Sequence, residues 1–135
     1  MHVYDLEKEA QFRPERHVEK VLGRFETQWD KVDVTVACWE PGHVSPHHAH
    51  PDATVIYFCF SGGGTMKVPG ETVAVKPGQF MVHPPGEPHE YANGPQRTLL
   101  FRVRCGAGMV SRTKEWPTNK EWKAKPEDIE YYNGT

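Results

Sequence analysis

The sequence contains no long apolar run and no excess of positive charge. Nowhere does it approach the ~18 consecutive apolar residues that a membrane-spanning helix needs, and the N-terminal segment MHVYDLEKEAQF is too charged for a secretory signal. Lys and Arg total 16 against 18 for Asp and Glu, and they are scattered along the chain. These absences predict a cytoplasmic protein that binds neither membranes nor nucleic acid.

Cysteine is scarce. Cys38, Cys59 and Cys105 lie far apart, show no CxxC spacing and are odd in number. This pattern argues against a disulfide framework. Because Cys38 and Cys59 lie inside apolar runs, we expect them to be small buried side chains.

Long helical periodicity is also absent, and short β segments separated by Gly and Pro take its place. Residues 32–38 and 99–103 alternate apolar with other side chains, which predicts strands that bury their apolar face. The run TVIYFCF (54–60) is β-branched and aromatic, and Pro69-Gly70 separates TMKV from TVAV as in a hairpin. Turn signals every ~8–12 residues predict an all-β barrel or jelly roll.

We expect one domain over residues 1–135, with its barrel core at about residues 30–105. Residues 1–29 form an N-terminal extension with one strand and a short helix. Residues 106–135 form an aromatic C-terminal tail. The tail offers apolar side chains that a monomer of this size would struggle to cover, and a homodimer is therefore predicted. These side chains are Trp116, Trp122, Tyr131 and Tyr132.

Histidine is over-represented in one part of the chain. Six of the eight histidines fall between His43 and His89. In the segment GHVSPHHAH, His48 and His50 are two residues apart, so on a strand they point to the same face about 7 Å apart. His89 follows the stiff turn PPGEP, whose prolines fix the backbone before it.

Two segments resemble the conserved motifs of the cupin family. Gly42–His50 reads Gly, five residues, His, one residue, His, and a Gly follows at position 62. Gly78–Asn93 reads Gly, five residues, Pro, one residue, Gly, two residues, His, three residues, Asn. The resemblance covers about residues 40–95. It implies a double-stranded β-helix, a jelly-roll barrel that holds one metal ion through His48, His50 and His89.

The sequence departs from the cupin pattern at the fourth metal ligand. The family usually places a Glu four or five residues after the second His, and here those positions are Thr54 and Val55. Asp52, Thr54 or a water molecule could replace it, although for Asp52 a turn residue beside Pro51 is the commoner meaning. Three neutral imidazoles leave the charge of a divalent ion uncompensated, which favours an anionic ligand that chelates through two atoms. The three-His site is similar to those of the thiol and β-diketone dioxygenases, which hold Fe(II).

Further candidates surround this site. If Val55 takes the vacant ligand position, Tyr57 and Cys59 share its face; Tyr57 is then a catalytic acid or hydrogen-bond donor, or a core aromatic residue. His83 either lines the pocket or packs outside it. Arg102 and Arg104 share one face of the last strand, where they hold a carboxylate or, as is commoner, are exposed.

The remaining histidines are interpreted as surface or core residues: His2, His17, His43 and His47. The expected function is an enzyme, dioxygenase- or lyase-like, acting on a small anionic chelating substrate. Its expected cofactor is one divalent transition metal (Fe, Mn, Ni, Zn or Cu, with Fe(II) favoured). The alternatives are a non-catalytic binding module for a small molecule or metal, and a cupin isomerase or decarboxylase.

Overall fold

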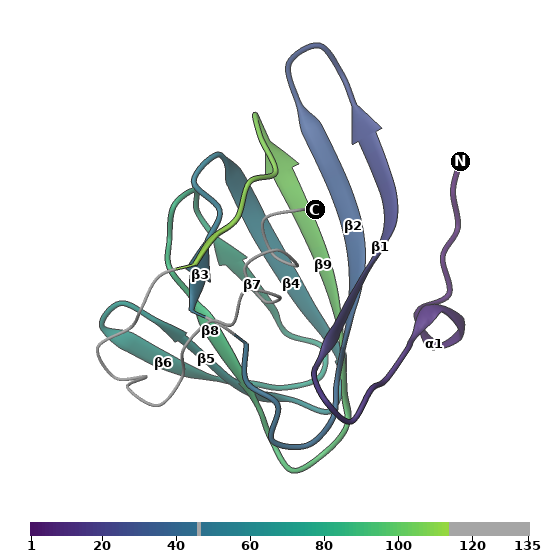
Figure 1. The fold of residues 1–135 in the computed structure, drawn as a ribbon, viewed down its shortest axis with the longest axis vertical. Coiled ribbons are helices and arrows are strands. Elements are labelled where there is room, and N and C mark those ends of the chain that lie inside the picture. The colour runs from purple at the N-terminus through teal and green to yellow at the C-terminus, as the bar shows by residue number, and fades with distance from the viewer. Residues whose placement is uncertain (46, 114–135) are drawn as a thin grey trace.

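A computed structural model describes residues 1–45 and 47–113, which form an almost entirely β structure (Figure 1). Within this part of the chain, no helix is long and apolar enough to cross a membrane. The elements, in chain order, are α1 (Leu6–Glu9), β1 (Val18–Glu26), β2 (Lys31–Trp39), β3 (His48–Ala49), β4 (Ala53–Ser61), β5 (Gly64–Val68), β6 (Glu71–Val75), β7 (Phe80–His83), β8 (Glu90–Asn93), β9 (Thr98–Gly106) and β10 (Arg112–Thr113).

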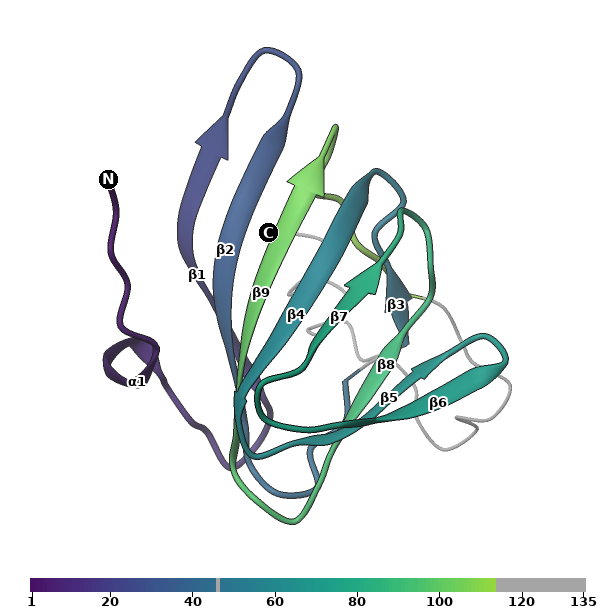
Figure 2. The same ribbon diagram turned by 180° about the vertical axis from the view of Figure 1, so that it is seen from behind.

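The strands form antiparallel sheets of five, three and two strands. The largest has the order β1-β2-β9-β4-β7, the second has the order β6-β5-β8, and β10 pairs with β3. In Figures 1 and 2, β3, β5, β6 and β8 lie on one side of the barrel and α1 lies beyond the edge strand β1. The predicted all-β class and double-stranded β-helix are confirmed.

The turn predicted at Pro69-Gly70 is present. It joins β5 to β6, which pair from Val68↔Glu71 to Gly64↔Val75. Gly70 has φ +77°, a left-handed conformation that glycine adopts without strain. Such a turn favours Pro at its second position and Gly at its third position.

The N-terminal residues cover part of the outer face of the large sheet. Helix α1 is capped by Asp5, whose side chain accepts a hydrogen bond from the amide of Lys8. Leu6, Ala10 and Phe12 pack against a buried outer cluster. The members of this cluster are Val36, Cys38 and Leu99.

The predicted orientation of two strands is wrong. In β2 and β9 the polar face points into the barrel: Asp33 and Arg104 are 0% exposed and Arg102 is 2% exposed. Val34 and Val103, on the opposite face, are only half-buried. An alternating pattern gives the spacing of the two faces, but it does not say which of them faces the interior.

Candidate metal centre

Three imidazoles meet inside the barrel. His48 on β3 forms an antiparallel bridge with His89, which immediately precedes β8. Their backbones exchange two hydrogen bonds of 3.1 and 2.9 Å. His50 follows β3, and one nitrogen from each of the three rings lies within 4.8 Å of the others. The predicted grouping of His48, His50 and His89 is confirmed.

The outward edges of two of these rings are held by the chain. The Nδ1 atom of His89 lies 3.0 Å from the carbonyl oxygen of Glu87. That of His50 lies 3.0 Å from the hydroxyl of Ser111. Among the described residues, the buried Nε2 atoms of His50 and His89 have no hydrogen-bond partner. Buried imidazole nitrogens that make no hydrogen bond are free to coordinate a metal ion, so these residues fit a transition metal.

The electrostatic state of the rings also fits a metal. Burial lowers the pKa of His50 and of His89, and the neighbouring imidazoles lower both values further. The rings of His50 and His89 are therefore neutral at pH 7. A neutral imidazole has the lone pair that a metal ligand requires.

The structure decides between the two positions for the missing carboxylate. Val55 is 1% exposed and shares the inner face of β4 with Tyr57 and Cys59. Thr54 is half-buried, and strand alternation places it on the opposite face. Asp52 is exposed in the turn before β4. No carboxylate of the described chain joins the three-histidine group.

Tyr57 and His83 lie beside the cluster. The centroid of the Tyr57 ring is 6.0 Å from that of His89 and 5.9 Å from that of His83. Burial raises the pKa of Tyr57 to about 12, so it is a neutral phenol at pH 7. His83 stacks on His89 with centroids 4.0 Å apart. Its Nδ1 lies 2.8 Å from Oε1 of Glu87, which can only accept, so Nδ1 carries the proton.

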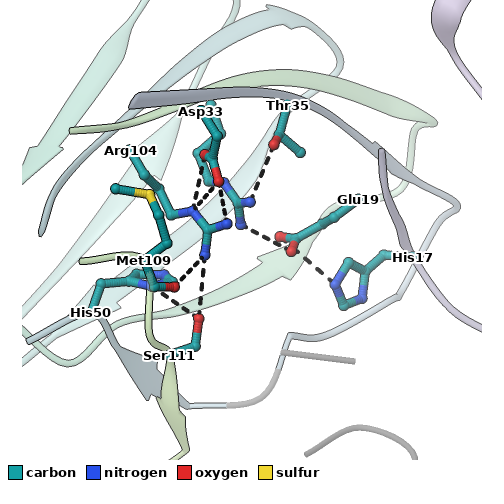
Figure 3. Close-up of polar contacts among 9 residues, drawn as sticks. His17, Glu19, Asp33, Thr35, His50, Arg104, Met109 and Ser111 are labelled. Atoms are coloured by element: carbon teal, nitrogen blue, oxygen red, sulfur yellow. Dashed lines mark hydrogen bonds and ion pairs between the residues drawn. The ribbon is translucent and has the colours of Figure 1, made fainter. Parts of the chain in front are cut away.

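The two arginines are buried and paired with carboxylates, which corrects the commoner interpretation of an exposed face. Figure 3 shows Arg104 beside Asp33. The Nε atom of Arg104 donates to both carboxylate oxygens of Asp33 at 3.0 Å. Arg102 donates from Nη1 to Glu19 at 3.0 Å and from Nη2 to the Thr35 hydroxyl at 3.3 Å. Burial would raise the pKa of Glu19, but the charge of Arg102 and other neighbours outweighs it and lowers that pKa.

Sequence reasoning missed Glu19, Asp33 and Ser111, which contact Arg102, Arg104 and His50 respectively. One signal was available: a buried arginine needs an acceptor, and Asp33 pairs directly with Arg104 when β2 and β9 are aligned. Glu19 and Ser111 lie in segments whose packing has no periodic signature. Neither could be found from local pattern.

The other histidines do not belong to the three-histidine group. His17 is buried and stacks on Trp39 with centroids 4.0 Å apart. Burial lowers the pKa of His17 to about 4, although the charge of Glu19 opposes this. His43 contacts the carbonyl oxygen of Pro14, and His47 is buried. His2 is exposed and lies against Phe25. The tail aromatics Trp116, Trp122, Tyr131 and Tyr132 lie outside the described residues.

Comparisons with known proteins agree with the fold. A family model described as a cupin domain matches residues 35–101. Gentisate 1,2 dioxygenase 1 of Aquipseudomonas alcaligenes is 28% identical over 71 residues, which are 53% of this chain but 20% of that protein. The match therefore spans about a fifth of this relative's length.

Solved structures share the architecture. A conserved protein with a double-stranded β-helix domain from Klebsiella pneumoniae subsp. pneumoniae MGH 78578 is 19% identical with a TM-score of 0.74, covering 86% of this chain and 99% of its own. A chain of the DMSP lyases RdDddP and RnDddQII is 27% identical with a TM-score of 0.58, covering 66% of this chain and 46% of its own.

Proposed function

The chain belongs to the cupin superfamily, and we propose that it is a metal-dependent enzyme, dioxygenase- or lyase-like, that acts on a small anionic chelating substrate. The observation that carries this proposal is a buried cluster of three imidazoles with an apolar residue, Val55, at the inward position of the missing carboxylate. The ligands proposed for the metal are His48, His50 and His89.

The charge of the site favours an anion. A divalent ion held by three neutral rings keeps both positive charges, and a poorly hydrated interior strengthens its attraction for an anionic ligand. Arg102 and Arg104 do not add a free cation, because Glu19 and Asp33 pair with them. The attraction proposed here comes from the metal centre itself.

Imidazole ligation suits iron, zinc, copper and nickel, and we propose Fe(II) ahead of Zn, Mn, Ni and Cu. A bound metal would act as a Lewis acid that polarises coordinated oxygen atoms. Tyr57 is proposed as a proton or hydrogen-bond donor to the substrate, since its neutral phenol lies beside His89. His83 and Cys59 are proposed as pocket residues, together with Val55 and Arg102. Thr54 is a weaker candidate because it lies on the other face of β4.

The name of one relative supports a reaction on a small organic anion. One relative is a gentisate dioxygenase and another structure is of DMSP lyases. Gentisate is a hydroxycarboxylate, whose carboxylate and adjacent hydroxyl form a chelating pair. Two alternatives would use the same site: a non-catalytic module that binds a small molecule or metal, and an isomerase or decarboxylase that needs no O2.

We also propose a cytoplasmic homodimer. Cys38, Cys59 and Cys105 are free thiols, as is usual in a reducing compartment. Phe80 and Val82 expose apolar surface on the outer face of the large sheet, which supports pairing with a second copy. Light scattering tests this: a mass of 15.4 kDa would contradict the dimer.

The decisive experiment starts with metal analysis of protein purified without a polyhistidine tag. The protein is then loaded with Fe(II) and titrated with gentisate and with hydroquinone, which lacks the carboxylate. Binding of gentisate but not of hydroquinone supports an anionic chelating substrate. O2 uptake would indicate an oxygenase. Turnover without O2 would indicate a lyase, an isomerase or a decarboxylase. Binding without turnover would indicate the non-catalytic module. Absence of any bound metal would contradict the proposal.

A further inference from the structure

The histidine rings at the metal site are anchored in two different ways. His89 is held by the carbonyl oxygen of Glu87, two residues earlier in the same segment. His50 is held by the hydroxyl of Ser111, which is 61 positions away in the sequence. The anchor of His89 is therefore built into the second cupin motif, whereas that of His50 comes from a segment beyond the last long strand.

Ser111 is placed by two independent sets of contacts. The backbone continues from it into β10, which pairs with β3 in the register Arg112↔Ala49 and Thr113↔His48. On the other side, Nη1 of Arg104 donates to the carbonyl oxygen of Met109 at 3.2 Å and lies 3.5 Å from the Ser111 hydroxyl. Ser111 is 1% exposed, and Figure 3 shows it between Arg104 and His50.

The arrangement connects the metal site to the buried ion pair. Arg104 makes three donor–acceptor contacts with Asp33. It also donates a hydrogen bond to the carbonyl oxygen of Met109. Two residues later, the Ser111 hydroxyl contacts Nδ1 of His50. A hydroxyl can both donate and accept, so Ser111 can hold the Nδ1 edge of His50 in either tautomer. With that edge held, the ring presents its Nε2 atom, which has no other partner among the described residues.

We propose that Ser111 is a positioning residue of the metal centre, which aims Nε2 of His50 at the ion, and that residues 107–113 are consequently part of the site. This rests on the proposed metal-binding function. Outer-shell hydrogen bonds fix the orientation of metal-ligating imidazoles, and their loss lowers metal affinity by about 10–100-fold.

The test compares Ser111→Ala with Ser45→Ala. Ser45 is a matched control because it is equally buried, and its hydroxyl accepts a hydrogen bond from the amide of Tyr91 rather than from a histidine ring. Affinity for Co(II) is measured by competition with a chelator, and the absorption bands of bound Co(II) report the ligand geometry. The unfolding free energy of both metal-free variants is measured in parallel.

We expect Ser111→Ala to lower Co(II) affinity by about 10–100-fold and to alter the Co(II) spectrum. Ser45→Ala should lose comparable stability and keep the wild-type affinity and spectrum. Ser111→Thr, which retains a hydroxyl, should recover part of the affinity and provides a second variant if the alanine protein does not fold. Equal affinities for the two alanine variants, or a threonine variant as weak as alanine, would overturn the inference while leaving the proposed function intact. A wild-type protein that binds no Co(II) would overturn both.

Discussion

The inner face of the five-stranded sheet is more polar than its outer face. Four polar inner side chains are buried: Asp33, Thr35, Arg102 and Arg104. The outer face carries apolar side chains that are half-buried or exposed: Val34, Ile56, Phe58, Phe80, Val82 and Val103. The inner face also carries a buried apolar cluster that includes Trp39, Val55 and Leu100, so charged and apolar side chains share the interior.

The difference shows what each face depends on. Inner charges are tolerated because Arg102 and Arg104 each have a carboxylate partner, and they donate additional hydrogen bonds to the Thr35 hydroxyl and the Met109 carbonyl oxygen. Outer apolar residues gain burial only where α1 and residues 10–12 cover them. Stability on the inner face should therefore depend on keeping partners together, whereas on the outer face it should depend little on any single residue.

Replacing Arg104 should have the largest effect on the stability of the inner face. Arg104→Met leaves Asp33 as an unpaired charge at a position with no access to water. We expect the free energy of unfolding of the metal-free protein to fall by about 3–5 kcal/mol. Urea denaturation measures it.

The neighbouring outer residue and a double variant serve as controls. Val103→Ala, one position away, should have a much smaller effect because Val103 is half-buried. The double variant Asp33→Leu with Arg104→Met removes both charges and should recover much of the loss. If the single Arg104→Met protein is as stable as Val103→Ala, the inner face does not depend on paired charges.

The second prediction concerns the metal ligands. Alanine at position 48, 50 or 89 should each lower metal affinity by more than the ~10–100-fold that follows loss of an outer-shell partner. Two imidazoles cannot hold a labile divalent ion tightly. Metal content after dialysis and chelator competition are the measurements.

His43→Ala and His47→Ala are the matched controls, because neither histidine belongs to the three-ring group. Both should retain metal. A uniform loss across all five variants would indicate a diffuse histidine cluster rather than a built centre.

The three-histidine group and the fold could be predicted from sequence because their signals are local. The spacing of His48, His50 and His89, and the turn residues around them, are properties of short segments. The ion pairs could not, since Glu19 and Arg102 are 83 positions apart and meet only when β1, β2 and β9 assemble. The wrong orientation of β2 has the same origin: Val36 and Cys38 are buried by the N-terminal segment rather than by the barrel interior.

The third prediction concerns His17, whose imidazole is buried against Trp39. The pKa of His17 is about 4 in the folded protein and near 6.5 when unfolded. Between these values the unfolded chain binds more protons, so stability falls as the pH decreases. From pH 7 to pH 5, His17 should account for a loss of about 2 kcal/mol.

His17→Phe keeps a ring against Trp39 and removes the titrating group. Urea denaturation of both metal-free proteins at pH 7, 6 and 5 should give a shallower pH dependence for the variant. Parallel curves would mean that His17 binds protons equally in the folded and unfolded protein, and its pKa would then not be lowered by folding.

The last prediction concerns adjacent positions on opposite faces of β4. Val55→Glu places a carboxylate on the inner face beside the three imidazoles, whereas Thr54→Glu places one on the outer face. The inner carboxylate should strengthen metal binding, because it adds a ligand and cancels one positive charge. For the same reason it should weaken the binding of an anionic ligand, which needs the same coordination position and the same positive charge. A lost charge-assisted contact costs about 1.5–3 kcal/mol, so gentisate affinity of the metal-loaded protein should fall about tenfold or more.

Chelator competition measures the metal affinity, and calorimetry measures the gentisate affinity. Thr54→Glu should leave both unchanged; if the two variants behave alike, the valine at position 55 has no role in keeping the site open to an anion.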